Sequence, residues 1–221
     1  MSEVRAVLLD LYDTLVWSDW PALRALIEGR AGVSSRGLLD AFERTRPSRS
    51  VGAHGSMEGD LAAVLEAAGL DRDDAMVRDL AGLITSFLET GVHLWDDSVP
   101  VLRELRARGV KTAIVSNSDH GTRPVVERLG LPGEADAVVL SFEVGSAKPD
   151  PGIYRTALDA LGATPEGSVF VDDQLDYCEG AEALGIRSFL ILRDGDHGTE
   201  GPNTDGGRGT IRDLRSLLDL V

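Results

Sequence analysis

A block of consecutive helical patterns separates the first predicted strand of this chain from all the others. Residues 4–9 form a short apolar run that ends in Asp10, as expected of a buried strand. Four stretches follow in which apolar residues recur with helical spacing, and no strand pattern lies between them. They span residues 23–27, 38–42, 61–65 and 77–88. We therefore predict that residues 17–91 form an all-helical module inserted after the first strand.

The rest of the chain alternates between short apolar strands and helices. Strands are predicted at residues 112–115, 137–140, 169–171 and 189–192. Helices are predicted at residues 101–108, 123–129, 153–161 and 180–184. Parallel strands need a crossover between them, and a helix supplies it, so this order indicates an α/β fold with a parallel sheet wrapped by helices. Residues 1–16 and 92–221 would form this α/β core.

The end of the chain has a composition of its own. Residues 193–210 are rich in glycine together with aspartate, asparagine and proline, which is typical of a mobile loop. Residues 211–218 predict a short closing helix.

Composition excludes several classes of function for the 221-residue chain. The formal net charge of -15 disfavours a nucleic acid partner, because a polyphosphate would be repelled. No apolar stretch approaches the roughly 18 residues that a membrane span needs, and the N-terminus does not resemble a signal peptide. A single cysteine, Cys178, fits a reducing compartment. We therefore expect a cytoplasmic protein, and its oligomeric state cannot be inferred from the sequence.

Polar residues follow the predicted strands at the points where those strands end. In open parallel sheets, ligands bind at the carboxyl ends of the strands, so these side chains are expected to meet at one edge. They are Asp10, Ser116, Asn117, Lys148, Asp172 and Asp173.

This set of side chains suits the attack of a carboxylate on a phosphoryl group or another electrophile. Asp10 would be the nucleophile, and Asp172 would share a Mg²⁺ ion with it, because Mg²⁺ prefers carboxylate and phosphate oxygens. Lys148 and the Ser116 hydroxyl would neutralise charge on the transferred group. Each residue alone has an ordinary explanation as a turn, cap or surface residue. Their occurrence in this order favours the catalytic interpretation.

The same residues resemble the motifs of the haloacid dehalogenase superfamily over essentially the whole chain. Asp10 and Thr14 match its first motif, Asp-x-Asp-x-Thr, and Ser116 matches the second. Lys148 matches the third motif, and the pair Asp172–Asp173 matches the fourth. The resemblance implies a Rossmann-like core with a helical cap inserted after the first strand.

The resemblance also implies the role of each residue. Asp10 is the nucleophile and Thr14 orients its loop. The backbone carbonyl of Tyr12 joins Asp10 and the acidic pair Asp172–Asp173 in binding Mg²⁺. The helical cap would close over the site, exclude water and select a small anionic substrate.

Tyr12 departs from the family's phosphatases, which carry an aspartate at this position that protonates the leaving group and then activates water. A tyrosine with a pKa near 10 can donate a proton but is a poor base at neutral pH. The neighbouring Asp13 faces away from the leaving group in the family pattern. Tyrosine at position 12 resembles the family's 2-haloacid dehalogenases, in which a halide leaves without a proton.

Three functions follow from these opposing features. A Mg²⁺-dependent phosphatase of a small metabolite is favoured, because the acidic pair Asp172–Asp173 would repel Asp10 unless a cation is present. A dehalogenase is the second alternative, although those enzymes place neutral side chains at the acidic pair. The third is a non-catalytic, phosphate-binding or regulatory relative. In the cap, most arginines are expected to form a solvated face, and one or two could reach an anionic substrate. These arginines are Arg24, Arg30, Arg36, Arg44, Arg46 and Arg49. His120, which follows the second core strand, could lie near the edge of the sheet, but the expected role is to start a helix.

Overall fold

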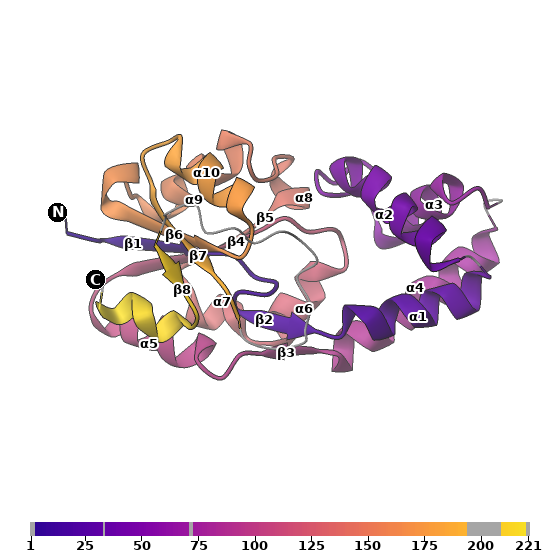
Figure 1. Cartoon of the computed structure of the whole chain (residues 1–221), viewed down its shortest axis with the longest axis horizontal. Helices are drawn as coiled ribbons and strands as arrows, with labels where there is room; N and C mark the ends of the chain where they lie inside the picture. Colours follow the sequence, from indigo (N-terminus) through magenta and orange to yellow (C-terminus); the bar gives the residue numbers. More distant parts are fainter. Residues whose placement is uncertain (1–2, 33, 71–72, 194–208, 220–221) are drawn as a thin grey trace.

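The core of the protein is a six-stranded parallel sheet, here in a computed structural model that describes residues 3–32, 34–70, 73–193 and 209–219 (Figure 1). Its strand order is β5-β4-β1-β6-β7-β8. The strands are β1 (Ala6–Leu9), β4 (Lys111–Ser116), β5 (Ala137–Leu140), β6 (Ser168–Asp172), β7 (Arg187–Ile191) and β8 (Thr210–Ile211). The predicted α/β class and parallel sheet are confirmed. Most of the predicted loop at 193–210 lies outside the described residues.

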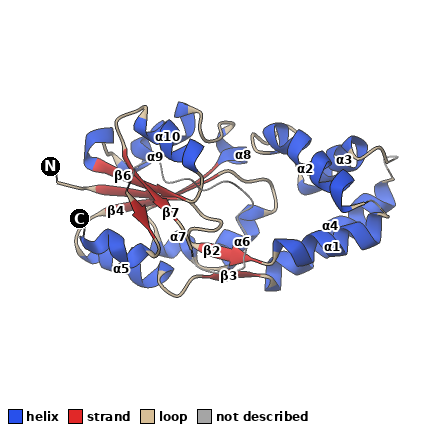
Figure 2. Cartoon of the chain, viewed as in Figure 1, coloured by secondary structure: helices blue, strands red, loops and turns tan. Residues whose placement is uncertain are grey.

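Helices cover both faces of this sheet (Figure 2). The helices of the core are α5 (Ser98–Ala107), α6 (Thr122–Arg128), α7 (Leu131–Glu134), α8 (Ser141–Val144), α9 (Pro151–Leu161), α10 (Leu175–Glu182) and the 3₁₀ helices η1 (Pro165–Gly167) and η2 (Leu214–Asp219). Helices α5, α6, α7 and η2 pack on one face, and α9 and α10 on the other. Every residue of β1 is buried because the strand is covered on both sides.

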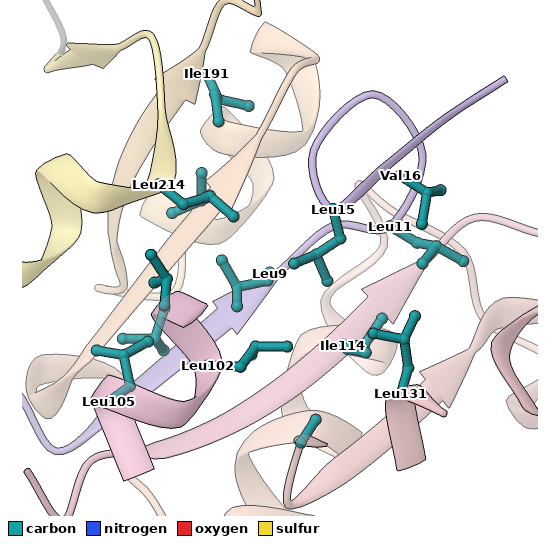
Figure 3. Packing of buried hydrophobic residues seen from close by; sticks show 14 of the residues in the cluster. Leu9, Leu11, Leu15, Val16, Leu102, Leu105, Ile114, Leu131, Ile191 and Leu214 are labelled. Atoms are coloured by element: carbon teal, nitrogen blue, oxygen red, sulfur yellow. The ribbon is translucent and has the colours of Figure 1, made fainter. Parts of the chain in front are cut away.

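The side chains of β1 alternate between two apolar cores. Val7 and Leu9 point into the core that contains Leu102 of α5 and Leu214 of η2 (Figure 3). Ala6 and Leu8 point into the opposite core, beneath α9. This double burial fixes the strand and therefore the position of the residue that follows it.

Four consecutive helices pack around a third apolar core, beside the sheet (Figure 1). They are α1 (Trp20–Ala31), α2 (Ser35–Arg49), α3 (Met57–Ala67) and α4 (Asp74–Thr90). Asp19 caps α1 by accepting a hydrogen bond from the backbone N–H of Ala22, at 2.9 Å. No helix in the described ranges is long and apolar enough to cross a membrane.

Two short strands connect these helices to the sheet, and the sequence patterns did not predict them. β2 (Val16–Ser18) and β3 (Val92–Leu94) form an antiparallel pair that leads into α1 and out of α4. Three residues are too few to show a strand period.

The predicted closing helix at 211–218 was wrong in its first residues. Ile211 belongs to β8 and pairs with Ile191 of β7. The helix that follows is 3₁₀ rather than α, and the Asp97 carboxylate accepts a hydrogen bond from the Leu214 N–H at its start, at 2.7 Å.

Candidate active site

The register of the sheet brings the predicted nucleophile and the predicted metal ligands to the same edge. Leu9 pairs with Ile114 of β4 and with Val171 of β6. Asp10 is therefore level with Asp172, and its N–H donates to the Val171 carbonyl at 2.9 Å. The loop after β1 turns back at once, and Asp13 has a φ of 60°, a left-handed conformation that non-glycine residues adopt rarely.

Three carboxylates lie together at this edge. Asp10, Asp172 and Asp173 each offer an oxygen within 4.8 Å of the others. Their exposures are 6%, 0% and 8%, so bulk water screens their charges poorly. Burial and Asp10 raise the pKa of Asp173 to about 7, and burial raises the pKa of Asp172 above its ordinary value.

Lys148 supplies a fixed positive charge between two of these acids. Its ammonium group donates to Asp10 Oδ1 at 2.5 Å and to Asp172 Oδ2 at 2.6 Å. The side chain is buried, and its nitrogen lies 5.5 Å and 5.1 Å from the ring centres of Phe170 and Tyr177. Burial lowers the pKa of the ammonium, but the two carboxylates outweigh this effect and raise it, so Lys148 stays charged.

Asn117 holds the segment that carries Lys148. Its side-chain hydrogen bonds to described residues go to the backbone of Lys148 and not to the acids. Its side-chain amide donates to the Lys148 carbonyl at 2.8 Å and accepts from the Lys148 N–H at 2.7 Å. This two-point contact fixes the backbone of Lys148 against the end of β4. The sequence predicted Asn117 as a site residue, and its position indicates a positioning role.

Two buried hydroxyls at the site have no hydrogen-bond partner among the described residues. They are Ser116 Oγ, at the end of β4, and Thr14 Oγ1. A buried hydroxyl without a partner is costly, so Ser116 is available to a substrate oxygen at the edge of the sheet. The backbone of Thr14 is held instead by Arg193, whose guanidinium donates to the Thr14 carbonyl at 2.5 Å and to Asp97 at 2.7 Å. Nothing in the sequence pointed to this role of Arg193.

The Tyr12 side chain turns toward the helices α1 and α6. Its ring lies 5.3 Å from the ring of Trp20, the first residue of α1. Burial raises the pKa of its hydroxyl well above the ordinary value, although the neighbouring Thr122 side chain lowers it. At neutral pH the side chain is therefore a neutral phenol and cannot act as a base.

Asp13 is electrostatically coupled to Asp10 and Asp173. Burial and the charge of Asp10 raise the pKa of Asp13 to about 7, and Asp13 in turn contributes to the raised pKa of Asp173. The site thus holds a fourth acid, Asp13, whose charge contributes to the pKa of a neighbouring carboxyl group.

The residues fit a divalent cation. When ionised, the acids of the cluster outnumber the one ammonium that contacts them, and hard carboxylate oxygens are the ligands that Mg²⁺ prefers. Asp10, Asp172 and Asp173 would hold the ion, with the backbone carbonyl of Tyr12 as the fourth predicted ligand.

Comparison with known proteins identifies the family of the chain. Residues 4–185 match the model of a family described as haloacid dehalogenase-like hydrolase. The chain belongs to this family. The haloacid dehalogenase-like chain is 31% identical to a phosphatase of Mycobacterium tuberculosis, over 86% of its own length and 79% of the relative's. It is also 31% identical to a glyceraldehyde 3-phosphate phosphatase of Methanopyrus kandleri, over 99% and 97% of the two chains.

Solved structures of both kinds of family enzyme resemble the chain. One is a haloacid dehalogenase-family phosphatase from Thermococcus onnurineus, with 25% identity, a TM-score of 0.67 and coverage of 98% and 97%. Another is an L-2-haloacid dehalogenase, with 25% identity, a TM-score of 0.69 and coverage of 100% and 99%. The chain is thus a hydrolase of this family with relatives named as phosphatases, and its overall shape alone does not separate phosphatase from dehalogenase.

Proposed function

We propose that the chain is a Mg²⁺-dependent phosphatase of a small phosphorylated metabolite, with an aspartyl-phosphate intermediate on Asp10. The observation that carries the proposal is the buried cluster of Asp10, Asp172 and Asp173 around a single ammonium. Three carboxylates in so little space repel one another unless a cation joins them. A phosphate ester that binds together with a metal ion brings positive as well as negative charge to the site. A haloacid brings only a further negative charge.

Three residues of the site have separate roles in the proposed reaction. Asp10 attacks phosphorus as the bond from phosphorus to the ester oxygen breaks and the alcohol leaves, and water then hydrolyses the aspartyl phosphate to release inorganic phosphate. Lys148 stays charged beside Asp10 to stabilise the developing negative charge. The Ser116 hydroxyl donates to an oxygen of the transferred group. Bound Mg²⁺ would lower the charge repulsion between phosphate and carboxylates.

A metal-removal experiment tests this function directly. Turnover of a panel of small phosphate monoesters that includes glyceraldehyde 3-phosphate is expected to vanish in excess chelator and to return with Mg²⁺. Asp10→Asn serves as the matched inactive variant, since it keeps the size of the nucleophile but not its charge. Full turnover in excess chelator would exclude the proposal, and no turnover with any ester would favour a non-catalytic relative.

The pH dependence of metal binding follows from Asp173, whose pKa rises to about 7 through burial and Asp10. In the unfolded chain the pKa of an aspartate is about 4. Between these values the folded, metal-free protein binds more protons than the unfolded one, so its stability falls as the pH rises from about 4 to about 7. Mg²⁺ needs the ionised carboxylate, so the rise in melting temperature on adding Mg²⁺ is expected to be larger at pH 8 than at pH 5.5. Thermal denaturation at both pH values measures this, with Asp173→Asn as control. An equal shift at both would contradict it.

Dehalogenation is the second candidate function, and Tyr12 favours it. A halide leaves without a proton, so a neutral phenol at this position costs such an enzyme nothing. Chloride release from a short 2-chloro acid discriminates the two functions. Release that requires Asp10 and ignores the chelator would establish the dehalogenase and reject the phosphatase.

A further inference from the structure

Two side-chain pairs join the helices α2 and α3 to the loop that follows β4. The guanidinium of Arg49, the last residue of α2, lies 2.6 Å from Asp119 Oδ2. The His120 ring nitrogen Nδ1 lies 2.7 Å from Oδ2 of Asp60, in the first turn of α3. The predicted role of His120 as a helix-start residue was wrong, because α6 begins at Thr122 and the imidazole points to Asp60 instead.

Each pair has one buried partner, Arg49 or Asp60, while the Asp119 side chain is 38% exposed. Arg49 is 9% exposed, and its other guanidinium nitrogens donate to Thr45 Oγ1 at 3.1 Å and to the Phe42 carbonyl at 3.1 Å. Asp60 is 4% exposed. Separating either pair would leave a buried charge or a buried polar group without its partner, which is far more costly than losing a surface pair.

The loop that receives both pairs also carries residues of the candidate active site. Asn117, at its start, fixes the Lys148 backbone, and Thr122, at its end, lies close enough to Tyr12 to affect the pKa of its hydroxyl. The two paired residues, Asp119 and His120, lie between them. A movement of α2 and α3 would therefore displace a segment whose two ends both contact the candidate site.

A third contact shows how closely the same helical module approaches the core. Gly52, with a φ of 71°, faces the backbone of Phe142 in α8 so closely that a Cβ atom there would lie 2.4 Å from the Phe142 carbonyl oxygen. Phe142 also packs on His120, with ring centres 4.8 Å apart. The contact leaves no space for a side chain at position 52.

We propose that the Arg49–Asp119 and Asp60–His120 pairs form a two-point latch that holds helices α1–α4 against the edge of the sheet carrying Asp10. Asp60 and His120 are then positioning residues, which act through the closed arrangement and not on the substrate. Closure of such a module keeps a bound substrate in place and keeps water out. Its effect on turnover rests on the proposed phosphatase function, whereas its effect on closure does not.

Closure can be measured without any substrate through Trp20. This residue lies in the helical module and contacts Tyr12 in the core, so opening would expose it to solvent. Replacing Trp17 and Trp95, the other two tryptophans of the chain, with phenylalanine leaves Trp20 as the only reporter. In this background we expect Arg49→Ala and Asp60→Asn each to raise acrylamide quenching of Trp20 about twofold or more.

Arg46→Ala is the matched control, because Arg46 lies one turn earlier on the same helix. Its pair with Glu43 is exposed, at 58% and 62%, and such pairs contribute little. We expect Arg46→Ala to leave quenching and kinetics unchanged. The double variant Asp60→Asn/His120→Asn is expected to quench no more than Asp60→Asn alone, because both changes remove one shared contact.

The kinetic result should separate positioning from catalysis. Loss of the latch weakens the binding of substrate and transition state alike, so KM is expected to rise about tenfold while kcat changes less than threefold. Gly52→Ala gives a second variant that removes no charge, since the added methyl group pushes against the Phe142 carbonyl. It should raise both quenching and KM.

Folded Arg49, Asp60 and Gly52 variants with the quenching of the parent would overturn the latch. A loss of kcat at unchanged KM would overturn the positioning role. Raised quenching in a protein that hydrolyses no phosphate ester would support the latch and reject the proposed phosphatase, so the two failures are distinguishable.

Discussion

Replacing Lys148 with alanine is expected to lower the turnover of a phosphate monoester by about 10²–10³-fold in saturating Mg²⁺. Its ammonium is the one charge that contacts both Asp10 and Asp172 in the described structure, at 2.5 Å and 2.6 Å. A preorganised charge in a buried site loses little to solvent, so its removal acts mainly on the transition state. Steady-state kinetics should therefore show the loss in kcat more than in KM.

Lys111, the only other lysine in the sequence, provides the matched control. It begins β4, at the amino end of the strand, and its ammonium donates to the Leu161 carbonyl at 3.0 Å. Lys111→Ala should leave turnover within about twofold of the parent, because the residue is a full strand length away from Ser116. Equal losses in both variants would show that the site lies elsewhere. Thermal melts in Mg²⁺ should confirm that Lys148→Ala is folded, since it leaves buried carboxylates with less compensating charge.

The sheet and the position of the edge that carries the candidate site could be predicted because they depend on patterns local in sequence. The apolar run before Asp10 predicted a strand buried on both faces, and the structure shows every residue of β1 buried. Once strands alternate with helices, a parallel sheet follows, and its carboxyl edge gathers Asp10, Ser116 and Asp172. None of these steps requires knowledge of side-chain directions.

The contacts that tune the site could not be predicted, because they join residues far apart in sequence through side-chain geometry. The pairing of Asn117 with the Lys148 backbone depends on the path of a loop. The pairing of Arg49 with Asp119 depends on how the helical module sits against the core. The six arginines scattered from Arg24 to Arg49 give no sign in the sequence that Arg49 is buried and the others are not. The electrostatic coupling of Asp13 to Asp10 could not be predicted either, since it accompanies a left-handed turn that the sequence does not reveal.

Tyr12→Asp is expected to raise the turnover of phosphate monoesters with poor leaving groups by about tenfold or more. If the scaffold is a phosphatase, the missing part is a carboxylate that protonates the leaving oxygen and then deprotonates water, and such a group contributes roughly 10²–10⁴-fold. The tyrosine cannot replace it, because burial raises the pKa of its hydroxyl and leaves a neutral phenol at neutral pH. Esters of acidic phenols should gain less, since their leaving group needs little protonation.

The parent protein should also keep its phosphoryl group on Asp10 for longer than the variant does. Attack by water on the acyl phosphate needs a base, and the parent has a neutral phenol at the position where the family's phosphatases carry one. Rapid quenching with a ³²P-labelled ester measures the fraction of phosphorylated enzyme. We expect this fraction to be high in the parent and low in Tyr12→Asp.

Tyr12→Phe separates the gain of a carboxylate from the loss of the tyrosine. It keeps the ring against Trp20 and removes only the hydroxyl, so its turnover should match the parent's within a few fold. Replacing the ring with aspartate, by contrast, leaves a cavity beside Trp20 and costs about 3–5 kcal/mol of stability, so melting curves must accompany the kinetics. A folded Tyr12→Asp variant with no gain on any phosphate ester, together with a large loss in Tyr12→Phe, would mean that the phenol itself takes part in the reaction. That result would overturn the interpretation of Tyr12 as a residue that contributes nothing to phosphate hydrolysis.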